Sequence, residues 1–287
     1  MPLPWSKAAP SNNPYESLRG LSIDEQCTTV TFLLVVAIVA QVELFGVLAE
    51  QKWVPRNLSR KFTHIGAGST MLTFMSAYPM GDSWKGRLGV CSILVAFMFA
   101  FSFVAYMSDA TMKNLPPLLL VRVKRLEGLC VSGKRIDLMG GTFIYCAVLA
   151  QVVVFAWSSP LNVISMSALF LGDGLANPVG KWLGRNMQYR VANFGSKSVP
   201  GSLTCFVCTL IGAYLWGLLF VWAGHWDTPF DMARYMWAAV WCGLAATAGE
   251  AISPPDVDNI YVVLFSNLMG YALAQSGYAP FLLVTKG

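Results

Sequence analysis

The sequence predicts an all-α integral membrane protein, a polytopic helical bundle of about seven to eight transmembrane helices. Of its 287 residues, 55% are hydrophobic and only 12% are charged, whereas soluble domains carry about 25% charged residues. Several apolar segments reach the roughly 17 to 25 residues that a helix needs to cross a bilayer. These segments lack the alternation of a membrane β-barrel, so helices are the structure that satisfies their backbone hydrogen bonds in lipid.

The apolar segments follow one another along the chain with mostly short connections. They are predicted at 27–49, 62–78, 88–107, 138–157, 160–180, 200–224, 232–252 and 259–283. Residues 1–26 form a polar N-terminal segment without the features of a secretory signal, and 27–287 form a single transmembrane domain. In the third connection, about 30 residues long, we expect a short surface helix or a lid.

Basic residues are distributed unevenly over the connections. Fourteen of the 20 Lys and Arg residues lie in the first, third and fifth connections, and six lie elsewhere. The positive-inside bias therefore places these connections in the cytoplasm, or in the stroma of a plastid. The net charge of +5 reports this orientation, and we expect no nucleic-acid partner. Three polar clusters fall on the basic side, and we expect them to converge.

The first cluster lies at the start of the second segment. Arg60 and Lys61 precede His64, which lies one helical turn beyond Arg60 on the same face. Cations at a membrane boundary often extend to lipid headgroups, which is the alternative to phosphate binding. His64 lies inside the apolar boundary, where an ionisable group needs a partner.

The second cluster begins with Asp173 at the end of the fifth segment. A carboxylate deep in a membrane costs about 2.5 to 3.5 kcal/mol on insertion scales, so Asp173 requires a cation or a water-filled pocket. Small residues follow it on one helical face, and close helix packing is the alternative explanation for them. They are Ala176, Gly180 and Gly184, whereas Gly174 directly follows the carboxylate. Asn177 and Pro178 are expected to break or distort the helix and to free backbone groups for a ligand.

The start of the sixth segment carries Lys197, Ser198, Gly201 and Ser202. Free N–H groups and the positive end of a helix favour phosphate there. The spacing does not match a Walker A loop. The alternative is a lysine that reaches the headgroups beside a serine N-cap.

The third cluster consists of Glu250, Asp256 and Asp258, in a connection that is interrupted by two prolines. Carboxylate oxygens are the ligands that a magnesium-type ion prefers. A solvated acidic loop is the alternative, but Glu250 lies at the end of a segment rather than in open water. Glu43, midway along the first segment, is a weaker candidate for which the sequence indicates no partner.

Together these motifs resemble the polyprenol kinase family, and in particular its phytol and farnesol kinase branch, related to dolichol kinase. The resemblance covers roughly residues 58 to 270. It is carried by Arg60-Lys61-x-x-His64, by Asp173-x-x-Ala176-x-x-x-Gly180-x-x-x-Gly184, by Lys197-Ser198-x-x-Gly201-Ser202, and by Glu250 followed by Pro254 and Asp258-Asn259. Two positions depart from the pattern, because Asn177 and Val257 stand where many such sequences have an aspartate.

The resemblance implies a transmembrane kinase domain that phosphorylates a long isoprenoid alcohol of the phytol, farnesol or geranylgeraniol type with CTP. Asp173, Asp256 and Asp258 are expected to hold Mg²⁺. The phosphates are expected to contact Lys197, Ser198 and Gly201, with Arg60 and Lys61 as further cations. Glu250 or His64 is expected to accept the proton of the alcohol. Phosphoryl transfer depends mainly on positioning and charge neutralisation, which these groups supply.

Two other functions remain open at this point. One is a cytidylyltransferase that forms a CDP-lipid, and the other is a transporter of an anionic or lipid solute. Transport sites lie near the middle of the bilayer, whereas these clusters lie at segment ends on one side. The expected location is a membrane of the endoplasmic reticulum or of a plastid, in contact with membrane lipid. The sequence leaves the oligomeric state open.

Overall fold

The computed structural model describes residues 18, 20–79, 83–128, 130, 134–191, 196–226, 229–254 and 257–283. All eight segments predicted to be helical are helical. Four helices are long and apolar enough, by length and composition, to cross a membrane: Ile23–Glu50, Trp84–Tyr106, Leu138–Ala156 and Val199–Ala223. The predicted class, an all-α membrane protein, is confirmed, while the total number of crossings stays a prediction.

The first half of the chain contains α1 (Ile23–Glu50), α2 (Arg56–Met75), α3 (Ser83–Tyr106), α4 (Asp109–Lys113), α5 (Pro117–Gly128), the π-helix η2 (Leu138–Thr142) and α6 (Phe143–Ala156). The second half contains α7 (Pro160–Ser167), the π-helix η3 (Ala168–Asp173), α8 (Gly174–Leu183), β1 (Gln188–Arg190), β2 (Ser196–Ser198), α9 (Val199–Ala223), α10 (Met232–Ile252), α11 (Asp258–Gln275) and the 3-10 helix η4 (Pro280–Leu283). The strands β1 and β2 form one antiparallel pair, with Tyr189 opposite Lys197.

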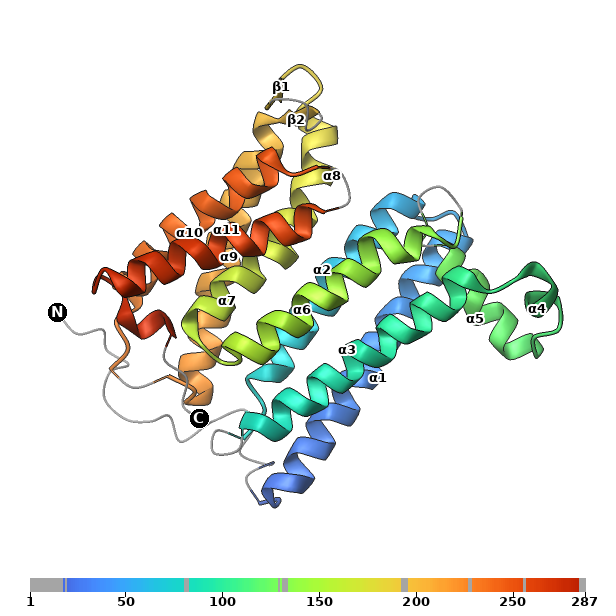
Figure 1. Ribbon diagram of the computed structural model, residues 1–287, viewed down its shortest axis with the longest axis horizontal. Helices are drawn as coiled ribbons and strands as arrows, with labels where there is room; N and C mark the ends of the chain where they lie inside the picture. The colour runs from blue at the N-terminus through green and yellow to red at the C-terminus, as the bar shows by residue number, and fades with distance from the viewer. Residues whose placement is uncertain are drawn as a thin grey trace.

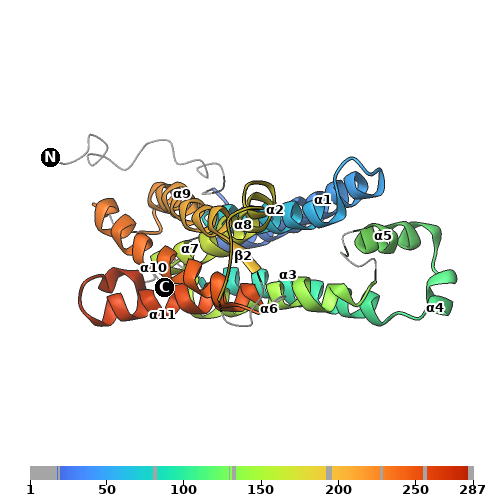
Figure 2. The same cartoon turned by 90° about the horizontal axis from the view of Figure 1, so that it is seen from above.

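The helices form two groups that lie next to each other (Figure 1). One contains α1, α2, α3 and α6, and the other contains α7 to α11. Seen from above, α1, α2 and α9 form one row and α3, α6 and α11 form another (Figure 2). Contacts of α2 with η3 and α8, and of α6 with α11, join the two groups.

Local sequence signals explain where the main helices begin and end. Ser22 and Glu25 form a capping box at the start of α1, with Ser22 N donating to Glu25 Oε2 at 2.9 Å. Ser198 caps α9, in which Pro200 occupies the first turn. The same helix ends at Gly224, whose φ of 85° is a left-handed conformation that glycine adopts without strain.

Asn177 and Pro178 were expected to break or distort the helix of the fifth segment, and the structure shows that they do not break it. The helix continues through Pro178 to Leu183, and the irregular turn lies earlier, in the π-helix Ala168–Asp173. A proline at a helical φ removes one hydrogen bond, which a membrane helix tolerates when its neighbours compensate. The π turn, a feature often found at functional sites, ends at Asp173.

The third connection folds as expected into short helices, α4 and α5. Arg125 of α5 forms ion pairs with Glu43 and, at 3.8 Å, with Glu50 of α1. Arg122 lies 3.8 Å from Glu43. Glu43 therefore does have partners, and its position inside an apolar segment is explained by the docking of α5.

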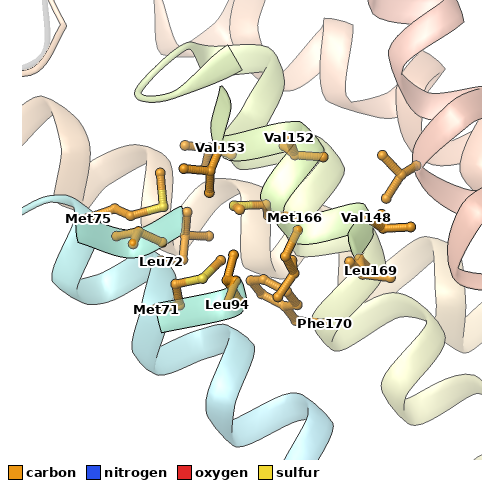
Figure 3. Close-up of a cluster of buried hydrophobic side chains, with 14 of the residues drawn as sticks. Met71, Leu72, Met75, Leu94, Val148, Val152, Val153, Met166, Leu169 and Phe170 are labelled. Carbon is orange, nitrogen blue, oxygen red and sulfur yellow. The ribbon is translucent and has the colours of Figure 1, made fainter. Parts of the chain in front are cut away.

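Many of the most buried side chains lie where the two groups of helices meet. Figure 3 shows buried methionines and aliphatic side chains of α2, α3 and α6 packed with those of α7 and η3. Phe170 of η3 is fully buried there. Gly68 of α2 lies against the Phe170 ring and has no room for a Cβ atom. This contact fixes η3, and with it Asp173, against α2.

Candidate active site

One cavity of about 420 Å³ lies where the polar ends of the helices meet. This volume is in the range of small-molecule sites, roughly 300 to 1,000 Å³. The predicted site residues that line it are Arg60, Lys61, His64, Asp173, Ala176, Gly180, Lys197, Ser198, Gly201, Ser202, Glu250 and Asp258. The three clusters that were expected to converge do so, although they come from distant parts of the chain.

Asp173 is paired with a cation of the first cluster. Lys61 Nζ donates to Asp173 Oδ2 at 2.8 Å and lies 3.5 Å from the Asp173 carbonyl oxygen. Both side chains are largely buried, with Asp173 only 3% and Lys61 only 13% exposed. The pair explains how a carboxylate is accommodated here, because its charge is balanced across the contact between α2 and η3.

A second ion pair connects the other two clusters. Lys197 Nζ donates to Glu250 Oε1 at 2.6 Å and lies 3.5 Å from Ser253 Oγ. Lys197 comes from β2 and Glu250 from the last turn of α10. Lys61 and Lys197 are thus each held by one carboxylate.

Asp258 lies at the first position of α11, just outside the predicted segment 259–283. Burial, followed by the nearby negative charge of Asp173, raises the pKa of Asp258 to about 6, although Lys61 and Lys197 lower it. The charged groups that shift the pKa of Asp258 therefore come from both ion pairs, Lys61–Asp173 and Lys197–Glu250. A divalent cation near Asp173 and Asp258 would relieve the repulsion between the two carboxylates.

Asn259, next to Asp258, was not among the predicted site residues. It lines the cavity and is only 5% exposed. Its side-chain oxygen is buried and has no hydrogen-bond partner among the residues that the structure describes. A buried polar atom without a partner is costly, so this oxygen is suited to contact a ligand or an ion. The adjacent Asp258 was the signal in the sequence that would have identified it.

Magnesium fits the donors that are present. Asp173 and Asp258 supply carboxylate oxygens and Asn259 an amide oxygen, all of which line the cavity. Within the described ranges, no group of three or more His, Cys, Asp or Glu residues is arranged to hold a metal. Magnesium is nevertheless usually bound by one or two carboxylates together with substrate phosphates. Asp256, the third expected ligand, lies outside the described residues.

His64 has its ring fixed by two neighbours. Its Nε2 lies 3.0 Å from the Leu169 carbonyl oxygen, and its ring centroid lies 4.0 Å from that of Tyr145. Tyr145 also donates to the His64 carbonyl oxygen at 3.0 Å. Because a carbonyl only accepts, a neutral His64 donates through Nε2 and keeps Nδ1 as an acceptor. Tyr145 was not among the site residues predicted from the sequence, because a tyrosine inside an apolar segment does not indicate which distant residue it contacts.

Arg60 lines the same cavity beside Gly141 of η2. A Cβ atom at Gly141 would lie 2.9 Å from Arg60 Nη1, so a side chain there would displace the guanidinium from its present position. The Nε atom of Arg60 is buried without a hydrogen-bond partner in the described part of the chain. The guanidinium therefore has a donor left for an anion, as the phosphate-binding prediction requires.

The start of α9 differs from the expectation of free backbone N–H groups. Val199 N donates to the Met187 carbonyl oxygen at 3.0 Å. Pro200 has no N–H, and Gly201 N donates to Ser198 Oγ at 3.2 Å. Ser198 is thus the N-cap of α9, which was the alternative reading of this motif, and Ser202 Oγ lies 2.6 Å from the Tyr189 hydroxyl. Lys197 and the positive end of α9 are the features that remain for an anion.

The small residues after Asp173 let α8 and α9 approach closely. A Cβ atom at Gly201 would lie 2.9 Å from the Ala176 carbonyl oxygen, and one at Gly180 would lie 2.6 Å from Ser198 Oγ. Gly184 ends α8 against Ser198, and Gly174 packs against Ile65. Gly174 and Gly184 are absent from the described cavity lining. Packing therefore accounts for these two glycines, and phosphate binding by them stays a prediction.

Comparison with known proteins gives relatives along most of the chain. No family model and no solved structure matches it. It is 29% identical to a protein of Triticum aestivum named probable phytol kinase, chloroplastic. The 254 aligned residues cover 85% of this chain and 76% of the relative. It is 25% identical to phytol kinase 1, chloroplastic, of Arabidopsis thaliana, in an alignment that covers 79% of this chain and 70% of the relative. It is 23% identical to farnesol kinase, chloroplastic, of the same plant, with 80% of this chain and 69% of the relative covered. The resemblance predicted from the motifs is confirmed.

Proposed function

We propose that this protein transfers the γ-phosphoryl group of CTP to the hydroxyl of a long-chain isoprenoid alcohol at a membrane surface. The observation that carries the proposal is the composition of the cavity lined by His64 and Asp173, which joins a cluster of paired charges to an apolar interior. A phosphate donor requires the first feature and a lipid alcohol the second. The relatives named phytol kinase and farnesol kinase support the enzyme class, a lipid alcohol kinase.

The same relatives bear on location. Their names place them in chloroplasts, and among the residues that the structure describes four helices are long and apolar enough to span a membrane. A plastid membrane is therefore the location that we propose, with the charged end of the cavity on the stromal side, where the positive-inside bias puts the basic connections.

Three cations are available to neutralise the donor phosphates. Lys197 and Lys61 are at present held by Glu250 and Asp173, and Arg60 has an unpaired buried Nε among the described residues. Binding of a triphosphate would let each lysine exchange its carboxylate for a phosphate oxygen. Magnesium bound by Asp173, Asp258 and Asn259 would supply further charge neutralisation at the transferring group.

The proton acceptor is the remaining role, and the positions of the two candidates differ. Glu250 is held by Lys197, which donates to its Oε1 at 2.6 Å. His64 lies beside Tyr145 and Asp173, where the apolar wall begins. An alcohol with its tail in the apolar part would present its hydroxyl near His64, so we assign proton acceptance to Nδ1 of His64.

Membranes that contain the protein test the proposal directly. They are supplied with CTP or ATP together with phytol, farnesol, geranylgeraniol or dolichol, and the product is identified by mass. A monophosphate formed with CTP is expected. Transfer of label from γ-labelled CTP distinguishes the kinase from a cytidylyltransferase, which would transfer label from the α position. Label from the α position in the lipid product, or uptake of solute without any phosphorylation, would overturn the proposal.

A further inference from the structure

The cavity continues beyond His64 into a part whose wall is apolar. Four helices contribute to it: α1 through Ile38 and Val42, α2 through Ala67 and Met71, α3 through Leu94, Phe97 and Phe101, and α6 through Leu149. We call these residues the apolar channel. The ion pairs described above lie at the opposite end, and the His64–Tyr145 ring pair marks the boundary between the two parts.

The positions of the lining residues along α2 give the depth of the channel. Arg60 lies at the charged end and Met71 at the other, and both line the same cavity. At 1.5 Å of rise per residue, these two positions on one helix are about 16 Å apart along its axis. The cavity thus extends from the end of the helices into the region between them.

The inner end of the channel is closed by tightly packed side chains. Met71 and Leu94 line the cavity and are only 1% and 4% exposed. Both belong to the core cluster of Figure 3, together with Met75 and Phe170, which have no exposed area. A ligand that enters from the charged end therefore meets Met71 and Leu94 as the floor.

We infer that the apolar channel binds the hydrocarbon tail of the alcohol substrate and that Met71 and Leu94 set the longest tail that is accommodated. The inference rests on the proposed function and goes beyond it by naming the residues that select the substrate. A tail in the channel has its hydroxyl beside His64 and Asp173, close to the cations that hold the donor. Because the tail of a membrane-dissolved alcohol is already in apolar surroundings before it binds, van der Waals packing and steric fit in the channel select its length.

Substitutions at the floor test the length limit. The measured quantity is kcat/KM for isoprenoid alcohols that each lengthen by one isoprene unit. Leu94→Ala and Met71→Ala open the floor and are expected to shift the preference toward the next longer alcohol by about tenfold. Leu94→Phe fills the channel and is expected to shift it toward the next shorter alcohol by a similar factor. Opposite shifts at one position are not explained by a general loss of folding.

Matched controls lie on the lipid-facing side of the same helix. Leu88 is 58% exposed and Phe99 is 73% exposed, and neither lines the cavity. Leu88→Ala and Leu88→Phe are expected to keep the wild-type length preference. Phe97→Ala is expected to raise KM for the alcohol about tenfold while KM for CTP stays unchanged, whereas Phe99→Ala changes neither.

The outcomes separate this inference from the proposed function. If the wild-type protein phosphorylates no alcohol, the proposed function and the inference about the channel are both wrong. If the wild type is active but the three floor variants keep its length preference, or if Leu88 variants shift it equally, the tail site is elsewhere and the kinase assignment remains. Opposite shifts for Leu94→Ala and Leu94→Phe, with the nucleotide KM unchanged, support the channel.

Discussion

Lys61 Nζ lies 2.8 Å from Asp173 Oδ2, so that an ion pair joins the first turns of α2 to the end of the π turn η3. The two residues are 112 positions apart in the sequence. Removing one partner of a buried pair costs about 3 to 5 kcal/mol, since the other charge is left uncompensated. The pair therefore stabilises the junction between the two groups of helices and places both a cation and a carboxylate in the cavity.

Replacement of this carboxylate is the first prediction. Asp173→Asn is expected to reduce CTP-dependent phosphorylation at least about 100-fold, because the carboxylate expected to hold Mg²⁺ at the transferring phosphate is lost. Activity is measured in membranes and divided by the amount of protein found by immunoblotting. Asp24 pairs with Lys85 through a carboxylate that is 74% exposed at the other end of the bundle, and Asp24→Asn should retain activity. Wild-type turnover in Asp173→Asn would contradict the assignment.

The second prediction concerns nucleotide affinity. Lys197→Gln is expected to raise KM for CTP about 10- to 100-fold, the equivalent of one hydrogen bond to a charged group. Initial rates over a range of CTP concentrations measure it. Arg190 is an exposed cation of the neighbouring strand β1, and Arg190→Gln serves as the control for a general change in surface charge. Equal KM changes in both variants would argue against a specific phosphate contact.

The third prediction is a divalent-cation requirement that depends on Asn259. A chelator is expected to abolish activity and magnesium to restore it. Asn259→Ala should raise the half-saturating magnesium concentration about tenfold, because a neutral oxygen donor is lost. Asn267, also on α11, instead accepts a hydrogen bond from Ser165 at 2.7 Å. If Asn267→Ala raises the magnesium requirement as much as Asn259→Ala does, the effect is structural.

The fourth prediction concerns the close approach of α8 and α9. Gly201→Ala is expected to lower stability by about 1 to 3 kcal/mol, since the new Cβ atom meets the backbone oxygen of Ala176 at 2.9 Å. Thermal unfolding in detergent measures the change. Gly140 is also helical and has no atom within 4 Å of an added Cβ. Gly140→Ala should leave the midpoint unchanged or raise it, and equal effects of the two substitutions would disprove the packing argument.

The fifth prediction separates a structural carboxylate from a functional one. Glu43 is 28% exposed and pairs with Arg122 and Arg125 of α5. Glu43→Gln is expected to retain phosphorylation with a loss of at most about 1 kcal/mol in stability, as is typical of partly exposed ion pairs. Activity and the thermal midpoint are measured on the same preparation. A loss of turnover comparable to that of Asp173→Asn would show that α1 contributes to catalysis.

Much of the site follows from the sequence because its signals are local. Hydropathy places charged residues such as Arg60 and Glu250 at the ends of apolar segments, and the distribution of basic residues predicts on which side of the membrane they lie. The prediction that Asp173 needs a cation follows from the cost of burying a charge. For Ser198 the sequence allowed two roles, phosphate binding or the N-cap of a helix. The hydrogen bond that Ser198 Oγ accepts from Gly201 N identifies it as the N-cap.

The sequence by itself determined the membrane class and the eight helical segments, because each depends on hydropathy over short stretches of chain, and it predicts the side on which the polar clusters lie from the distribution of basic residues. The tertiary structure decided which charges pair, as in Lys61 with Asp173 and Glu43 with Arg125. It also decided that the helix continues through Pro178 and that Met71 and Leu94 close an apolar channel. These features depend on how distant helices pack, and hydropathy within one segment does not encode that packing.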